Sequence, residues 1–300
     1  MTGGMTPTVC LAVILAMAAA VRLILSVKRG VTMERAQGGM ERPYGQTWGK
    51  VEKPFCGLGQ TTGSQVVQAD CAQAVRTGAG IMAVIADGIG KENTGKVCAQ
   101  IAVDTLLDRY EPYRMLNNPE YFFRTAVYEA NLRIQKTIGE RKGGTCLAAV
   151  FLNGQAMHYA LAGDLRIALL RGGELIPISE GQTMDVLAVH AYEEGKISKK
   201  EAVWSMEEKR AWNYLGLDGF HEIETAERPI RLKAGDQIFL ASKGIWQELS
   251  WAEIEDVLIS PMNPQEKAER LAAMADRKPG SSKENGSVFI IEAEVGNETD

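Results

Sequence analysis

The chain has 300 residues, which is long enough for one large domain or two small ones with a buried core. Its composition, 45% hydrophobic and 24% charged, is typical of folded proteins. A formal net charge of -5 gives no basic surface for nucleic acid, so we set nucleic acid aside as a partner. The chain has no C-x-x-C pair and its histidines lie far apart, so neither a zinc site nor a disulfide framework is expected.

The first element in chain order is an apolar segment. Residues 8–27 read TVCLAVILAMAAAVRLILSV and are apolar except for Arg22. Roughly 20 residues at about 1.5 Å each make a helix of about 30 Å, which can cross a membrane. Lys28 and Arg29 follow, whereas residues 1–7 contain no basic residue, so we predict a single-pass anchor in the cell membrane with the C-terminal part in the cytosol. A cleaved signal peptide is the alternative, disfavoured by the missing basic start.

After this segment, residues 28–57 are rich in glycine, methionine and charge and show no sustained periodicity. We interpret them as a juxtamembrane linker. Residues 58–295 are predicted to form one mixed α/β domain. Its first clear strand is the apolar run at 82–86, which ends at Asp87 and Gly88. A helix is expected next, because four apolar residues share one helical face: Cys98, Ile101, Ala102 and Leu106.

Local start and turn signals place the following elements. Asn118 before Pro119 is a helix cap with proline at the first helical position, which predicts a helix beginning there. Three apolar strands come next, the first two joined by an Asn-Gly hairpin turn: 146–152, 156–162 and 165–170.

The C-terminal elements carry equally clear signals. Ser250 and Glu253 form a capping-box pattern, and Asn263-Pro264 repeats the start with a cap and a proline. A last strand is predicted at 287–295. Strands and paired helices in this order indicate sheets covered by helices, without a regular βαβ repeat.

A series of short motifs runs through the predicted domain. In chain order they are Ala86-Asp87-Gly88-Ile89-Gly90, Gly144-Thr145, Gly163-Asp164-Leu165-Arg166, Gly195-Lys196-Ile197-Ser198, Gly235-Asp236, Ser242-Lys243-Gly244 and Glu284-Asn285. Their order and spacing resemble the signatures of the PPM-type metal-dependent protein phosphatases, the protein phosphatase 2C group. The resemblance covers roughly residues 58–295. It implies an α+β fold, a four-layer sandwich of two central antiparallel β-sheets flanked by α-helices.

The resemblance also implies a metal site. The family hydrolyses phosphoserine or phosphothreonine with a water held between two Mg²⁺ or Mn²⁺ ions, which prefer oxygen ligands. Carried over by position, Asp87 would bridge both metals and the Gly88 carbonyl would bind the first. Asp70 would contact metal-bound water. Glu284 occupies the position of one of the aspartates that bind the second metal. Its side chain is one methylene longer than aspartate and can still donate an oxygen. The alternative is that Glu284 is only a surface acid.

Other positions depart from the family pattern. Lys243 replaces the second metal's remaining aspartate, and an ammonium group has three donors and no lone pair for a metal. The phosphate-gripping arginine of the family is Gln65 here, which removes a charged contact. Three further changes affect the N-E and D-H-S motifs: Gln68, Ala69 and Gly181-Gln182-Thr183. We therefore predict an impaired site with Mg²⁺ or Mn²⁺ at one position or at none, and assign no catalytic residue.

Lys243 is also a candidate to replace an ion. An ammonium among Asp87, Glu284 and Asp70 would neutralise carboxylates that otherwise repel one another. The alternative is a solvated side chain at the rim of the pocket.

Two main functions follow from these residues. The first is a membrane-anchored pseudophosphatase that binds a phosphoserine or phosphothreonine protein, or a signalling kinase, and regulates it. The alternative is an active but atypical serine/threonine phosphatase that uses the first metal position, with Glu284 recruiting a weaker second ion. A purely structural domain without a ligand is the third possibility.

Overall fold

The computed structural model describes residues 56–205, 210–220 and 222–293. The predicted anchor at 8–27 and nearly all of the predicted linker at 28–57 lie outside this part of the chain. Cys56 and Gly57, at the end of that linker segment, already belong to the first strand. Within the described ranges, no helix has the length and apolarity that a membrane span needs. The anchor and the domain boundaries therefore stay predictions.

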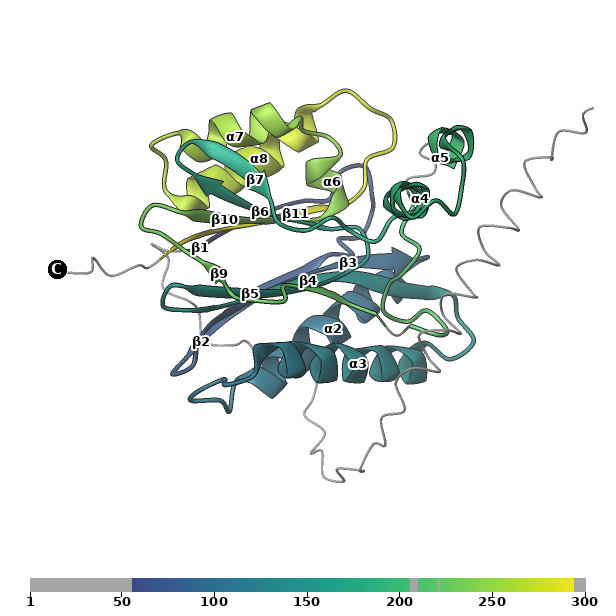
Figure 1. The fold of residues 1–300 in the computed structure, drawn as a ribbon, viewed down its shortest axis with the longest axis horizontal. Coiled ribbons are helices and arrows are strands. Elements are labelled where there is room, and N and C mark those ends of the chain that lie inside the picture. The colour runs from purple at the N-terminus through teal and green to yellow at the C-terminus, as the bar shows by residue number, and fades with distance from the viewer. Residues whose placement is uncertain (1–55, 206–209, 221, 294–300) are drawn as a thin grey trace, which may run out of the picture. The chain divides into compact units, whose positions relative to one another are not determined.

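Two antiparallel sheets form the centre of the domain (Figure 1). The five-stranded sheet runs in the order β1 (Cys56–Thr61), β11 (Gly286–Glu292), β10 (Gln237–Ala241), β6 (Arg166–Arg171) and β7 (Glu174–Pro177). The six-stranded sheet runs in the order β2 (Cys71–Thr77), β3 (Gly80–Gly90), β4 (Gly143–Asn153), β5 (Ala156–Ala162) and β8 (Glu224–Thr225), with β9 (Ile230–Arg231) also paired to β5.

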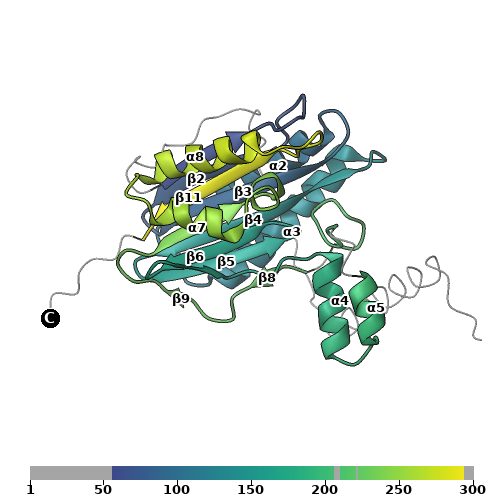
Figure 2. The same cartoon turned by 90° about the horizontal axis from the view of Figure 1, so that it is seen from above.

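Helices cover the outer face of each sheet, as Figure 1 shows. The six-stranded sheet carries α2 (Thr94–Tyr110) and α3 (Pro119–Ile138), whereas the five-stranded sheet carries α7 (Trp251–Ile259) and α8 (Pro264–Arg277). The short helix α6 (Lys243–Trp246) follows β10 directly. Two further helices, α4 (Met184–Glu193) and α5 (Lys199–Ser205), project from one end of the sandwich (Figure 2). The predicted α+β arrangement of two antiparallel sheets flanked by helices is confirmed.

The helix starts follow the local signals. Asn118 caps α3 by accepting a hydrogen bond from the Tyr121 amide, and Pro119 occupies the first turn. Both C-terminal helices begin with a complete capping box, formed by Ser250 with Glu253 and by Asn263 with Glu266.

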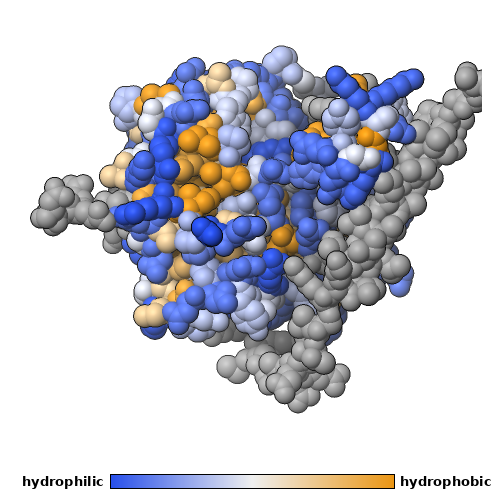
Figure 3. All heavy atoms as spheres, in the orientation of Figure 1, coloured by the Kyte–Doolittle hydropathy of each residue, from blue (hydrophilic) through white to orange (hydrophobic). Residues whose placement is uncertain are grey.

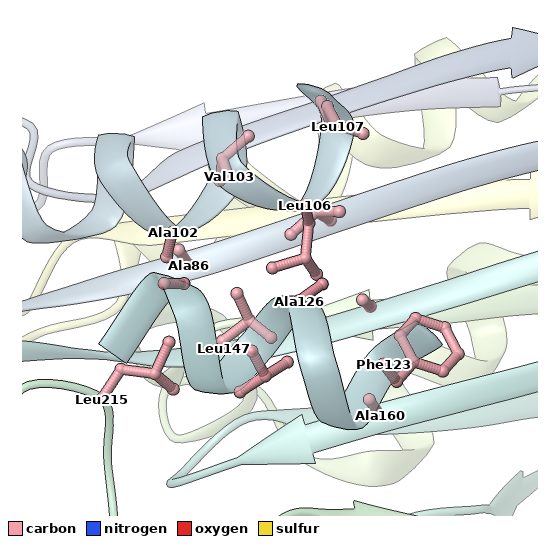
Figure 4. Packing of buried hydrophobic residues seen from close by; sticks show 14 of the residues in the cluster. Ala86, Ala102, Val103, Leu106, Leu107, Phe123, Ala126, Leu147, Ala160 and Leu215 are labelled. Carbon is pink, nitrogen blue, oxygen red and sulfur yellow. The ribbon is translucent and has the colours of Figure 1, made fainter. Parts of the chain in front are cut away.

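The continuous apolar run in β3 is explained by burial on both of its faces. Alternate residues such as Ile85 face the other sheet, whereas Val84 and Ala86 pack with the helices α2 and α3. Small residues let the helices approach closely, as the positions of Ala86, Ala102 and Ala126 in Figure 4 illustrate. This packing fixes the part of β3 that leads into Asp87.

The remaining surface is mostly polar where it can be seen. In Figure 3, the largest apolar area lies in the upper left part of the face and polar side chains surround it. A third buried cluster lies between the five-stranded sheet and the helices α7 and α8, and includes Phe239, Leu271 and Ile290. The sandwich therefore has three apolar layers, one between the sheets and one beneath each pair of helices.

Candidate metal centre

Strand register brings Asp70 and Asp87 together. In the β2–β3 pair Cys71 lies opposite Ala86, so the next position outward places Asp70 opposite Asp87. Side chains alternate along a strand, and Asp87 lies two residues after Ile85, which faces the second sheet. Both carboxyl groups therefore lie at the end of the six-stranded sheet, on the side that faces its partner.

The five-stranded sheet contributes two serines to the same place. Ser242 follows β10, and its hydroxyl donates to Asp70 Oδ2 over 2.8 Å. The same hydroxyl accepts a hydrogen bond of 2.8 Å from the Ser287 amide in β11. The Ser287 side chain also lies near enough to Asp70 to lower the pKa of its carboxyl group. Asp70 is thus held by residues of the opposite sheet.

Asn285 forms a second set of hydrogen bonds between the segments that lead out of the two sheets. Its side-chain oxygen accepts a hydrogen bond from the Ala69 amide at 2.8 Å, and its amide nitrogen donates to the Thr62 carbonyl at 3.0 Å. Gly244 in α6 packs against the Asn285 backbone so closely that a Cβ atom there would lie 2.2 Å from the carbonyl oxygen. Any larger residue would push α6 away from the site.

Gly88, predicted as a carbonyl ligand, is also required by close packing. A Cβ atom at this position would lie 2.4 Å from the Gly95 oxygen and 2.6 Å from the Ala69 oxygen. The Thr145 hydroxyl donates to the Asp87 carbonyl at 2.9 Å from the neighbouring strand β4. The backbone around Asp87 and Gly88 is therefore held on both sides.

The two aspartates, which we call the carboxylate pair, have strongly altered acidity. Only 6% of Asp70 is exposed, and burial raises its pKa to about 6 although the hydroxyl groups of Ser242 and Ser287 oppose the rise. Asp87 is partly exposed, but desolvation by the surrounding protein and the charges of Asp70 and Glu284 raise its pKa well above the usual value. Two adjacent carboxylates therefore favour either a shared proton or a cation.

The second pair of predicted residues, Lys243 and Glu284, forms an ion pair. Lys243 Nζ lies 3.0 Å from Glu284 Oε1, and the two side chains are 24% and 52% exposed. Burial lowers the pKa of Lys243, but the hydrogen bond to Glu284 and the charges of Glu284, Asp164 and Asp87 outweigh it and hold the pKa above its usual value. We call these residues the lysine pair. Its ammonium is within ion-pair range of a predicted carboxylate, as expected.

Asp164 and Arg166 line the same region. Asp164 is only 4% exposed, and its Oδ1 accepts a hydrogen bond of 3.2 Å from Arg166 Nη1. The Arg166 guanidinium also lies 4.1 Å from the ring centre of Trp246 in α6. Burial raises the pKa of Asp164 to about 6, opposed by the charges of Arg166 and Lys243. Both residues thus support the loop before β6 and the short helix α6.

The predicted metal ligands do not form one cluster. The carboxylate pair meets at the end of the six-stranded sheet, whereas Glu284 contacts Lys243. Across the described ranges, no three aspartate, glutamate, histidine or cysteine side chains are arranged to hold a metal ion. Gln65, at the family's arginine position, is exposed and donates to the Lys283 carbonyl at 3.0 Å.

Similar proteins of known structure or activity are serine/threonine phosphatases. No family model matches the chain. The serine/threonine phosphatase Stp of Listeria welshimeri is 27% identical over 217 residues, covering 70% of this chain and 83% of Stp. The S. agalactiae serine/threonine phosphatase has a TM-score of 0.70 at 21% identity, over 80% of this chain and 99% of that one. The catalytic domain of PstP, in complex with 2 manganese ions, has a TM-score of 0.62 at 26% identity, over 79% of this chain and 96% of that one.

These homologues and solved structures support a PPM-type protein phosphatase family for this chain. Its fold is the PPM fold. The motifs that contain Asp87, Ser242 and Asn285 lie where the two sheets meet. Ser242 and Asn285 stand inside the S-K-G and E-N motifs, so the sequence indicated their region without their hydrogen bonds. Ser287 was missed because it lies in no motif and only strand register brings it to Asp70.

The PPM-type cation chemistry can be tested against the residues that are present. Asp70 Oδ1 is buried, and among the described residues it has no hydrogen-bond donor except a protonated Asp87. An unpartnered buried carboxylate oxygen beside a second carboxyl group and a backbone carbonyl is an oxygen donor set suited to Mg²⁺ or Mn²⁺. The carboxylate pair with Gly88 therefore fits one divalent cation. The lysine pair does not fit a second, because an ammonium group lies at the ligand position.

Proposed function

We propose that this chain is a divalent-cation-dependent protein phosphatase of the PPM type that acts on phosphoserine or phosphothreonine proteins. The observation that carries the proposal is the carboxylate pair, with its unpartnered oxygen at the junction of the two sheets. The names of the relatives support this activity better than the pseudophosphatase that we predicted first from the sequence.

The chain's own residues have defined parts in this proposal. Asp87, Asp70 and the Gly88 carbonyl would hold Mg²⁺ or Mn²⁺, and Ser242 keeps the Asp70 carboxylate oriented by a hydrogen bond. When bound, such an ion lowers the pKa of water and offsets charge on a phosphoryl group. Asp87 is partly exposed, so the pair can be reached from solvent.

Release of inorganic phosphate from a phosphothreonine peptide tests the activity. We expect the full-length protein to release phosphate with Mn²⁺ or Mg²⁺, and to stop when EDTA removes the ion. Asp104→Asn is the control for substitutions in the carboxylate pair and should leave phosphate release unchanged. Asp104 is a partly buried acid in α2 whose pKa is also raised by burial. Turnover that continues in EDTA, or no turnover with any divalent ion, would contradict the proposal.

A second candidate function rests on the lysine pair and on Gln65. A lysine at a ligand position and an uncharged residue at the arginine position both weaken hydrolysis, while they leave a surface that can bind a phosphoprotein or a signalling kinase. In this case a phosphopeptide would bind to the protein without being cleaved. Calorimetry with the same phosphothreonine peptide separates the two functions, because the pseudophosphatase gives a binding isotherm and no released phosphate.

The N-terminal segment leads to a separate proposal about location. We propose that residues 8–27 anchor the domain in the cell membrane with the C-terminal part in the cytosol, since this run of 20 residues, apolar except for Arg22, precedes Lys28 and Arg29. The protein should then sediment with membranes and resist extraction by high salt and by alkaline carbonate. Recovery of a soluble chain that starts near residue 30 would support a cleaved signal peptide instead.

A further inference from the structure

Lys243 lies between two acids of the site, Asp87 of the carboxylate pair and Glu284. Its backbone amide lies near enough to the Asp87 carboxyl group to lower the pKa of that group, and its ammonium lies 3.0 Å from Glu284 Oε1. The short helix α6 begins at this residue, and Gly244 next to it packs against the Asn285 backbone. The position of the lysine is therefore determined by the backbone on both sides.

The surroundings of the ammonium are acidic. Asp87, Asp164 and Glu284 all act on it electrostatically, and Asp164 Oδ2 is buried with no hydrogen-bond partner among the described residues. One positive charge offsets part of the repulsion between these carboxylates. A divalent cation cannot share this place with an ammonium group, which repels it and offers no lone pair.

We propose that the ammonium of Lys243 takes the place of a second divalent cation, so that the site binds one ion, between Asp70, Asp87 and the Gly88 carbonyl. This inference rests on the cation site of the proposed function, although it concerns the number of ions and not turnover. The PstP catalytic domain, by contrast, is in complex with 2 manganese ions. In this chain the second charge is a covalent part of the protein and does not depend on ion concentration.

The test counts manganese ions bound to the full-length chain in detergent, by equilibrium dialysis with metal analysis. We expect one ion per chain for the natural protein and two for Lys243→Asp, which restores a carboxylate beside Glu284. At Mn²⁺ about 100 times the dissociation constant, the added ion should raise the Tm of Lys243→Asp by about 5–10 °C beyond the rise in the natural protein.

Two further variants keep the test decisive. Lys278→Asp is the control. Lys278 also forms a partly exposed ion pair, with Glu253, but it lies far from the carboxylate pair in the sequence. This variant should still bind one ion. Lys243→Met removes the charge without adding a ligand, so it should lower the Tm without Mn²⁺ more than Lys278→Met does and still bind one ion. This variant gives a result even if Lys243→Asp fails to fold.

Three outcomes would overturn the inference: two ions in the natural protein, no additional ion in Lys243→Asp, or an equal gain in Lys278→Asp. Its failure is distinguishable from failure of the phosphatase. Two bound ions with phosphate release would leave the proposed function intact. One bound ion without phosphate release would contradict the proposed function and support the inference.

Discussion

The two halves of the site differ in how deeply the protein encloses them. The carboxylate pair is held by a hydrogen bond from Ser242 and has an oxygen without a partner, whereas the lysine pair is a single contact of 3.0 Å between partly exposed side chains. Enclosed groups lose their solvation and need a specific partner, but exposed groups can exchange a protein contact for water. The two halves should therefore respond differently to substitution.

Asp87→Asn should have the largest effect, because it breaks the enclosed half directly. Changes in residues that merely orient a ligand cost about 10- to 100-fold in metal affinity or activity, so loss of the ligand itself should reduce phosphopeptide turnover by at least about 100-fold. Without a cation the variant should be at least as stable as the natural protein at pH 8, since it no longer buries an acid. Turnover within a few-fold of that of Asp104→Asn would show that Asp87 is not a ligand.

The pH dependence of cation binding sharpens the same comparison. The pKa of Asp70 rises from 3.8 to about 6 in the folded protein, so the folded state binds a proton more tightly than the unfolded chain between these values. Without a cation, stability should therefore fall by about 3 kcal/mol in all as pH rises from below about 3 to above about 7. Protons compete with the ion for this carboxylate, so the Mn²⁺-induced rise in Tm should be small at pH 5 and complete at pH 7.5. An equal rise at both pH values would contradict a cation bound at the carboxylate pair.

Ser242→Ala tests how far the hydrogen bonds hold the enclosed half. The substitution removes the donor to Asp70 Oδ2 and the acceptor of the Ser287 amide, both buried, and should destabilise the fold by about 1–3 kcal/mol. Urea unfolding of the full-length protein measures the loss. Ser281→Ala, an exposed serine in the loop after α8, is the control and should change stability by no more than about 0.5 kcal/mol.

Glu284→Gln should have the smallest effect, because it breaks only the exposed half. An ion pair with this exposure contributes up to about 1 kcal/mol, and the glutamine can still accept a hydrogen bond from Lys243. Urea unfolding should show a loss within this limit, and 1 M salt should reduce it further. A loss of several kcal/mol would mean that the lysine pair is as strongly held as the carboxylate pair.

Much of the fold was predictable because its signals are local. The strand at 156–162 coincides with β5, and the starts at Asn118 and Asn263 are real caps. Other strands were missed for physical reasons. The sequence of β2, CAQAVRT, mixes small and polar residues and lacks the apolar run that marks a buried strand. The layered order of the sheets came only from the family resemblance, because pairing between distant strands leaves no periodic pattern in the chain.

The site was predicted less completely than the fold. Motif positions identified Asp87, Glu284 and Lys243. The contact of Lys243 with Glu284 was expected from their positions in the family motifs together with their charges. The hydrogen bonds of Ser287 and Asn285 depend on how two sheets approach each other, and no residue pattern along a single strand reports that distance. Roles in metal binding stay predictions until ions are measured.

Position 243 acts on Asp87 in two ways, through its backbone amide and through the charge of its side chain. Only the second of these changes when another side chain stands there. One substitution at position 243 would therefore change the source of one positive charge in the site. The charge would come either from a bound ion or from the lysine ammonium. A protein that carries the amine would keep this charge when cellular manganese becomes scarce.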